Sequence, residues 1–137
     1  MKAEEKKKIL FVCVENARRS QMAHGFTEKL GKGKLEVYSA GSRPASLIDP
    51  LVIEVMKEKA IDLSFKRPKS LNDLPPIEMD YLVTMGCEET CPAVSAKKTI
   101  EWEIPDPKGK SIDVFRNVRD IIEHRVKSLL EEIERNI

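Results

Sequence analysis

The sequence has little of several features, and each shortage narrows the class of protein. Its 137 residues contain three cysteines, and an odd count in a chain of this size fits no closed disulfide framework. No apolar stretch approaches the roughly 18 residues that a membrane-spanning helix needs. The first hydrophobic run, Ile9 to Val14, is also too short for a signal peptide. We therefore expect a cytoplasmic protein whose thiols are kept reduced and free for chemistry.

An excess of charge of one sign is also missing. The chain has 24 Lys and Arg against 23 Asp and Glu, a formal net charge of +1. Such a balance gives no long-range attraction for nucleic acid or anionic lipid, so we expect neither partner. A chain of this length buries about two-thirds of its unfolded surface, enough for a core without a structural metal. We expect one domain over residues 1–137, a monomer, with no bound metal or organic cofactor.

Hydrophobic patterning divides the chain into alternating strands and helices. Strand-like segments are expected at 7–14, 35–40, 81–85 and 99–104, the first of them apolar enough to be buried on both faces. Helical spacing of apolar residues predicts helices from about Ser20 to Leu30, from Pro50 to Asp62, and after Ser111 to Ile133. This alternation predicts an α/β fold, a four-stranded parallel sheet with helices on both faces in three α/β/α layers.

The loop after the first strand carries the clearest chemical signal. In a sheet of this kind ligands bind at the carboxyl ends of the strands. A loop wrapped between a strand and a helix N-terminus turns its backbone N–H groups inward, and the helix dipole adds positive charge, so a tetrahedral oxyanion can bind. The loop residues expected to hold that oxyanion are Val14, Glu15, Asn16, Ala17, Arg18, Arg19 and Ser20.

Two side chains of this loop give the site its predicted reactivity. The planar guanidinium of Arg19 matches two oxyanion oxygens. The same positive field favours the thiolate of Cys13, the form that acts as a nucleophile, and Ser20 can donate a hydrogen bond to it. A cysteine alone at a strand end is as often a small buried hydrophobe. Together with Asn16, which tolerates a left-handed backbone, the set favours catalysis.

These residues also carry a resemblance. Cys13, Asn16, Arg19 and Ser20 match the Cys-x-x-Asn-x-x-Arg-Ser loop of the low-molecular-weight protein tyrosine phosphatases, and the strand order and the late Asp106-Pro107 agree over nearly the whole chain. The resemblance implies a low-molecular-weight phosphatase-like fold. That scaffold is shared by phosphatases and by arsenate reductases that take electrons from thioredoxin. The segments 21–23 and 84–87 look like the reductase.

The other two cysteines separate these relatives. A phosphatase needs one thiolate, one arginine and a general acid, a role that the resemblance gives to Asp106. A reductase must also pass two electrons to arsenate, so a second thiolate has to attack the Cys13 sulfur. The resemblance implies a Cys13-Cys87 disulfide first and a Cys87-Cys91 disulfide after it. We therefore predict reduction of arsenate to arsenite, with thioredoxin as reductant and arsenic detoxification as the role.

Two alternatives stay open at this stage. The first is a phosphatase acting through a Cys13 thiophosphate, although aromatic residues are only 5% of the chain and no tyrosine pair follows Asp106 to grip a phenyl ring. The second is a non-enzymatic redox or zinc-binding module, with Cys87 and Cys91 joined by His24 and His124, although neither histidine has a partner at finger spacing.

The sequence differs from the family's pattern at a few positions. Glu15 places a carboxylate beside an anion site, which does no harm if the side chain points outward. Some of these reductases bind potassium behind the loop through the loop Asn and an acidic helix residue, and the equivalent position here is His24. We therefore expect no potassium site and another brace for Asn16. His24 and His124 are expected to be exposed helix residues, and Ser39 is expected to hydrogen-bond Asn16.

Overall fold

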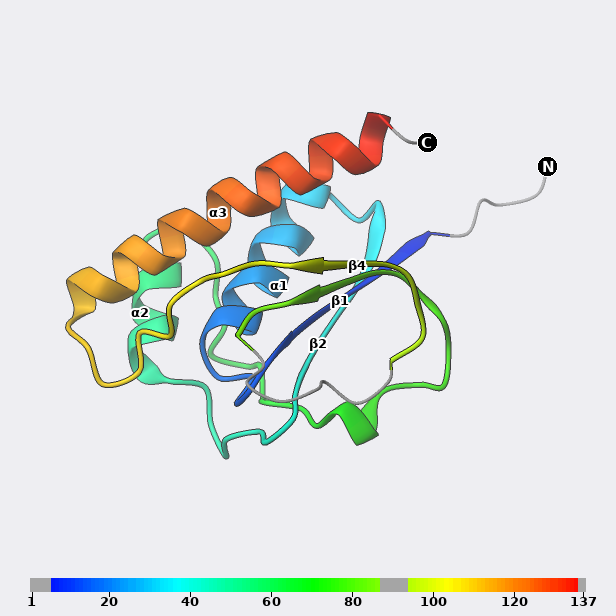
Figure 1. Cartoon of the computed structure of the whole chain (residues 1–137). Helices are drawn as coiled ribbons and strands as arrows, with labels where there is room; N and C mark the ends of the chain where they lie inside the picture. Colours follow the sequence, from blue (N-terminus) through cyan, green and yellow to red (C-terminus); the bar gives the residue numbers. More distant parts are fainter. Residues whose placement is uncertain (1–5, 87–93, 136–137) are drawn as a thin grey trace.

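Four parallel strands form the centre of the protein. A computed structural model describes residues 6–86 and 94–135 (Figure 1). The strands are β1 (Lys7–Cys13), β2 (Leu35–Gly41), β3 (Met79–Thr84) and β4 (Ala96–Glu101), in the order β2-β1-β3-β4. β1 is central, and residues 9–13 are buried because both faces of the sheet are covered there. The carboxyl ends of β1 and β3 therefore meet at one edge.

Three α-helices of the described residues pack against one face of this sheet. They are α1 (Arg19–Gly31), α2 (Pro50–Lys57) and α3 (Ile112–Arg135), and Figure 1 shows them on the same side. Alternate β1 residues such as Phe11 share a core with Phe26 of α1 and Phe115 of α3. The side chains of Leu10 and Val12 point the other way, as a strand's period of two requires.

The opposite face of the sheet is covered more thinly. Leu71 and Leu74, at the short 3₁₀ helix η1 (Leu71–Asp73), pack against a cluster that contains Leu10 and Val12. The predicted α/β fold with a four-stranded parallel sheet is confirmed. The second outer layer differs in kind from the expectation, because among the described residues it is built by η1 and flanking loop.

Two elements, the second helix and the fourth strand, differ by three residues or more from their predicted bounds. The second helix ends at Lys57 and not at Asp62, because Ala60 adopts a left-handed backbone (φ 60°). That turn lets Ile61 N–H reach the Met56 carbonyl (3.0 Å) and buries the Ile61 side chain. The fourth strand spans 96–101, so Trp102 lies beyond it and packs on Phe11, their rings 5.9 Å apart.

No helix within residues 6–86 and 94–135 is long and apolar enough to cross a membrane.

Candidate active site

The loop between β1 and α1 has its carbonyls turned outward. The carbonyls of Val14, Glu15 and Ala17 accept hydrogen bonds from the backbone N–H groups of residues 43, 45 and 49, at 2.8, 2.9 and 3.2 Å. No backbone N–H of residues 14–19 donates to a carbonyl in the described part of the chain. Asn16 takes the left-handed conformation expected of it (φ 52°) and reverses the chain. The loop thus has unpaired backbone donors beside a helix N-terminus, the arrangement that binds oxyanions.

Gly41, at the end of β2, permits this loop to lie where it does. A Cβ atom at Gly41 would sit 2.5 Å from the Val14 carbonyl oxygen and 2.9 Å from the Asn16 nitrogen. Both contacts are with backbone, which cannot swing aside. Gly41 therefore belongs to the site.

A chain of hydrogen bonds leads to the Cys13 sulfur. The Gln21 amide donates to Asn16 Oδ1 (2.9 Å), the Asn16 amide donates to Ser20 Oγ (2.6 Å), and Ser20 Oγ lies 2.9 Å from Cys13 Sγ. The Lys69 backbone N–H also donates to Asn16 Oδ1 (2.8 Å). Because Ser20 Oγ accepts from Asn16, its own proton is available to the sulfur. All of these side chains are buried, so the Ser20 hydroxyl is directed at a sulfur atom shielded from water.

Arg19 reaches from the first turn of α1 to the segment after β4. Its Nη1 donates to the Ile104 carbonyl (3.0 Å), and its Nη2 lies 3.5 Å from Asp106 Oδ2. Arg19 Nε is buried and has no partner among the described residues, so a donor stays available for a ligand. Gly86 packs against the guanidinium with a left-handed φ of 74°, leaving no room for a side chain there.

Arg18 holds three carboxylates, a role that the sequence did not reveal. It contacts Glu15 Oε1 at 2.9 Å, Asp49 Oδ2 at 3.3 Å and Asp106 Oδ1 at 3.0 Å, and only 7% of its side chain is exposed. Lys108 Nζ closes the set on Glu15 Oε2 at 2.7 Å. Glu15, Arg18, Asp49, Asp106 and Lys108 are called the loop network below. The only sequence signal for Asp49 was its place before Pro50 at a helix start.

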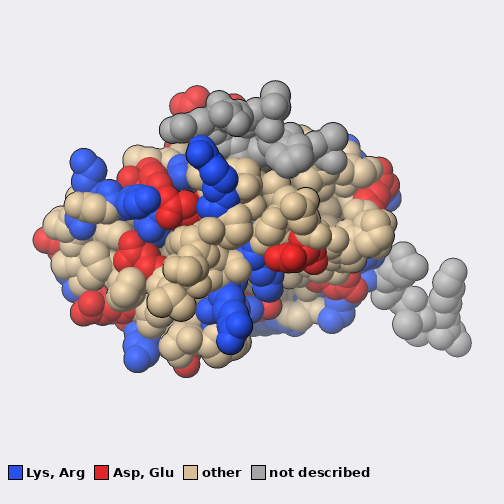
Figure 2. Space-filling model, turned by 90° about the horizontal axis from the view of Figure 1, so that it is seen from below, with Lys and Arg blue, Asp and Glu red and all other residues tan. Residues whose placement is uncertain are grey.

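The acidic residue inside the loop is thereby neutralised. Lys108, and after it Arg18, hold the pKa of Glu15 below its ordinary value, so Glu15 is charged at neutral pH and paired. Figure 2 shows the face seen from below in Figure 1, where Lys and Arg alternate with Asp and Glu without a broad area of one charge.

Two expectations about His24 and Ser39 are wrong. His24 is buried, with 3% of its surface exposed, and Ser39 Oγ lies 2.7 Å from His24 Nδ1 and makes no hydrogen bond with Asn16. Burial lowers the pKa of His24, so the ring is neutral at pH 7. Its Nε2 lies 3.3 Å from Glu28 Oε2. Asn16 is braced by Gln21 and Lys69, which agrees with the expectation of another brace.

The remaining predicted site residues are Cys87 and Cys91, and both lie outside the described residues. The two histidines proposed as their zinc partners sit on different helices, His24 buried in α1 and His124 exposed on α3. In residues 6–86 and 94–135, His, Cys, Asp and Glu form no group of three that could hold a metal ion.

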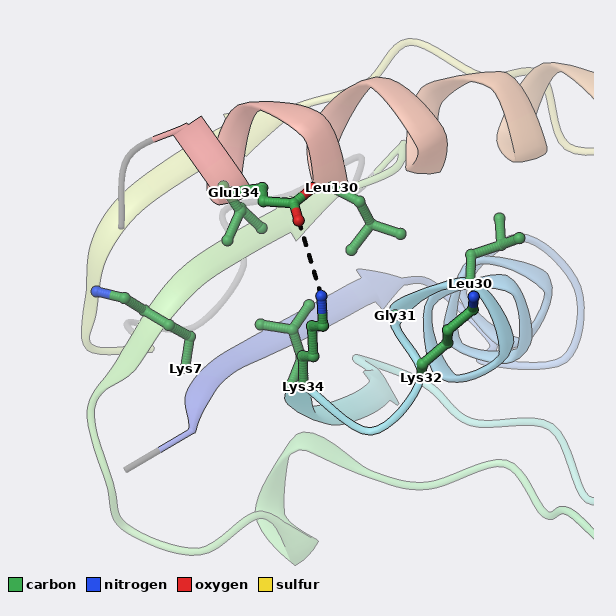
Figure 3. A pocket seen from close by; sticks show the side chains of 9 residues that line it. Lys7, Leu30, Gly31, Lys32, Lys34, Leu130 and Glu134 are labelled. Atoms are coloured by element: carbon green, nitrogen blue, oxygen red, sulfur yellow. Dashed lines mark ion pairs between the residues drawn. The ribbon is translucent and has the colours of Figure 1, made fainter. Parts of the chain in front are cut away.

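A pocket of about 200 Å³ lies at the opposite edge of the sheet from the loop (Figure 3). Its floor includes Leu30 and Leu130, and Lys34 pairs with Glu134 at its rim, 3.7 Å apart. Both charged side chains are more than 70% exposed. No predicted site residue lines it.

Comparison with known proteins identifies the family. Residues 8–137 match the family described as low molecular weight phosphotyrosine protein phosphatase. The chain belongs to this family. Among curated members, a glutaredoxin arsenate reductase of Synechocystis sp. is 36% identical over 130 residues, which cover 93% of this chain and 98% of that protein.

Solved structures of other members have the same fold. An arsenate reductase in the phosphate binding state superposes with a TM-score of 0.85 and 35% identity, covering 93% of this chain and 98% of that one. A thioredoxin-dependent arsenate reductase of Corynebacterium glutamicum gives a TM-score of 0.81 at 33% identity. That match covers 98% of this chain and 65% of the other.

Proposed function

We propose that this low-molecular-weight phosphatase family member reduces arsenate to arsenite. The observation that carries the proposal is the loop of residues 14–19 next to Cys13, whose carbonyls are bonded to residues 43, 45 and 49 while its own N–H groups donate to no carbonyl among the described residues. Arg19 adds a guanidinium with an unpaired Nε. Such a site fits a small tetrahedral oxyanion, and the similar proteins named above are arsenate reductases. A monomer acting in the cytoplasm, in the family's detoxification role, is part of the proposal.

The reaction begins at Cys13. Its thiolate attacks the arsenic of arsenate, the Asp106 carboxylate takes a proton from the bound arsenate and passes it to the leaving oxygen, and water leaves, so that a sulfur–arsenic(V) bond forms. Arg19 and the backbone N–H groups of residues 14–19 balance the charge of the remaining oxygens.

The second stage transfers two electrons. A thiolate at Cys87 attacks Cys13 Sγ, the electron pair of the sulfur–arsenic bond stays on arsenic, and arsenite leaves behind a Cys13-Cys87 disulfide. Cys91 then attacks Cys87, frees Cys13, and leaves a Cys87-Cys91 disulfide for an external dithiol to reduce with two electrons and two protons. Gly86 supports this route, because it packs against the Arg19 guanidinium one residue before Cys87.

A coupled assay tests the proposal. Arsenate-dependent NADPH consumption is measured with thioredoxin and thioredoxin reductase, and in parallel with glutaredoxin, glutathione and glutathione reductase. We expect turnover with thioredoxin, since the proposed Cys87-Cys91 pair is a self-contained dithiol. The curated relative that is a glutaredoxin arsenate reductase makes the second system the necessary comparison. No arsenate-dependent oxidation in either system would refute the reductase proposal.

Cys87→Ser separates arsenate reduction from simple hydrolysis. We expect this variant to lose arsenite production while it keeps slow hydrolysis of p-nitrophenyl phosphate, because Cys13, Arg19 and Asp106 are untouched. The disulfides that form after one equivalent of arsenate are identified by peptide mapping. If hydrolysis disappears together with arsenite production, the two activities do not share the loop in the proposed way.

The family match favours a phosphatase as the second candidate. If that were the main activity, phosphomonoester hydrolysis would be fast and unaffected by Cys87→Ser or Cys91→Ser. If the protein were a zinc-binding module, the purified protein would contain stoichiometric zinc and show no arsenate-dependent turnover. Elemental analysis measures the zinc, and the coupled assay on the same sample measures the turnover.

A further inference from the structure

Two adjacent arginines share one carboxylate at the mouth of the loop. Arg18 Nε lies 3.0 Å from Asp106 Oδ1, whereas Arg19 Nη2 lies 3.5 Å from Asp106 Oδ2. The Arg18 contact has the length of a charge-assisted hydrogen bond, and the Arg19 contact is longer than one. Asp106 is therefore held mainly by Arg18.

The other partners of Arg18 fix its position. Asp49 N-caps α2 through Oδ1, which accepts from the Leu51 N–H at 3.0 Å, and its own N–H donates to the Ala17 carbonyl. Asp49 thus joins the Arg18 guanidinium to the helix and to the loop. Glu15 holds the same guanidinium from inside the loop and is itself held by Lys108. With 7% of its side chain exposed, Arg18 has little freedom to move.

The charges at this place balance. Arg18, Arg19 and Lys108 supply three positive charges, and Glu15, Asp49 and Asp106 supply three negative ones. Without Arg18, three carboxylates would face two cations beside a site for an anion. Asp106 would also be left with Arg19 and the Lys108 backbone N–H, and it would compete with the incoming oxyanion for the Arg19 guanidinium.

We infer that Arg18 is a positioning residue for the proposed reaction: by holding Asp106 it keeps the Arg19 guanidinium available to the oxyanion. This inference rests on the proposed function of the loop. It gives the two arginines different roles: Arg19 contacts the substrate, and Arg18 orients the Asp106 carboxylate beside it. A planar fork is needed to contact several carboxylates at once, so a lysine at position 18 keeps the charge and loses the geometry.

Two variants separate charge from geometry. Arg18→Gln removes the charge, and we expect it to weaken binding of inorganic phosphate, measured by calorimetry, about tenfold and to slow arsenite release in a single turnover about tenfold or more. Arg18→Lys is expected to restore most of the phosphate affinity while the single-turnover rate stays low. Arg116→Gln is the matched control, because Arg116 on α3 contacts two carboxylates, Glu58 and Asp113, that are not members of the loop network. It should leave both measurements unchanged.

The outcomes distinguish this inference from the proposed function. If the wild type releases no arsenite, the reductase proposal fails, and hydrolysis of p-nitrophenyl phosphate by the same variants still tests the role of Arg18. If the wild type is active and both Arg18 variants bind and react as it does, the inference is wrong. Should Arg18→Gln fail to fold, Arg18→Lys decides alone: a normal rate overturns the inference, and a slow rate with near-normal phosphate affinity supports it.

Discussion

The loop network and a second network, between α2 and α3, use the same kinds of side chain in different surroundings. In the second, Glu58 at the end of α2 accepts from Arg116 (2.8 Å) and from Arg119 (2.6 Å) on α3. Asp113 and Asp120 complete what is called the helix network here. The Arg116 side chain is 39% exposed, against 7% for Arg18.

This difference in exposure separates the two roles. Water screens the Arg116 pairs of the helix network, so they add little to stability. The Arg119 side chain is 9% exposed, so its pair with Glu58 is screened less. Arg18 at the centre of the loop network is 7% exposed, and its removal leaves uncompensated carboxylates beside Cys13 and Arg19. Similar ion pairs therefore have little effect on the chemistry when they lie in the helix network. In the loop network they determine the charge balance beside Cys13 and Arg19.

The largest loss of activity is expected from substitution of the nucleophile beside the loop network. Cys13→Ser should lower single-turnover arsenite release by about 10⁴-fold or more, because a neutral hydroxyl is a far weaker nucleophile than a thiolate. The thermal midpoint should change little, since serine is close to cysteine in size. Retention of a tenth of the wild-type rate would show that the chemistry lies elsewhere.

Gly41→Ala tests whether the backbone beside the loop of residues 14–19 leaves less room for a side chain than the end of α1 at Gly31. Its Cβ would meet the Val14 carbonyl oxygen at 2.5 Å, so we expect a loss of about 1–3 kcal/mol in unfolding free energy together with weaker phosphate binding. Gly31→Ala, where the nearest atom would be Leu130 Cδ2 at 3.8 Å, is the control. Denaturant unfolding and calorimetry measure both. Equal stability of the two variants would contradict the proposed constraint.

Gln21→Ala probes the hydrogen bonds that lead to Cys13. Removing the Gln21 amide leaves Asn16 Oδ1 with the Lys69 N–H alone, and we expect the single-turnover rate to fall about tenfold. Thr27→Val on the same helix is the matched control, because Thr27 Oγ1 is buried without a partner among the described residues. If Thr27→Val slowed the reaction as much, the effect would belong to α1 as a whole.

The smallest effect is expected in the helix network, and it depends on pH. Arg116 and then Arg119 lower the pKa of Glu58 from 4.5 to about 2. Because the folded pKa is the lower one, the stabilising contribution is complete above pH 4.5 and is lost as the pH falls toward 2. Glu58→Gln should therefore be slightly less stable at pH 7 and should lose less stability on acidification. The unfolding stability of both proteins is measured as the pH is lowered. An equal loss of stability in the two proteins would disprove this.

Local sequence signals predicted much of the fold and the centre of the site. The apolar run at 7–14 predicted a strand buried on both faces, and β1 confirms it. Asn16 was expected to tolerate a left-handed backbone and does so. The proximity of Cys13 to Ser20 followed from their places at a strand end and the next helix start. In each of these cases the deciding contacts are close in sequence.

What the sequence did not predict depends on distant partners. Arg18 meets Asp49 and Asp106, which are 31 and 88 residues further along the chain, and nothing local marks them as its partners. His24 was expected on an exposed face. Residues 19–27 of α1 are all buried, so this part of the helix has no exposed face that a sequence pattern could indicate. The start of β4 was missed because its pairing with β3, and not its own alternation, determines its register.

The outward bonding of the loop carbonyls has a consequence for protein engineering. The stretch 42–49 is largely exposed and resembles an ordinary connection, the kind of place where a tag or graft is usually inserted. Yet its N–H groups at residues 43, 45 and 49 hold the three carbonyls that shape the loop. Lengthening it would release that support. The turn at 32–34 leaves these bonds untouched and is the safer site for an insertion.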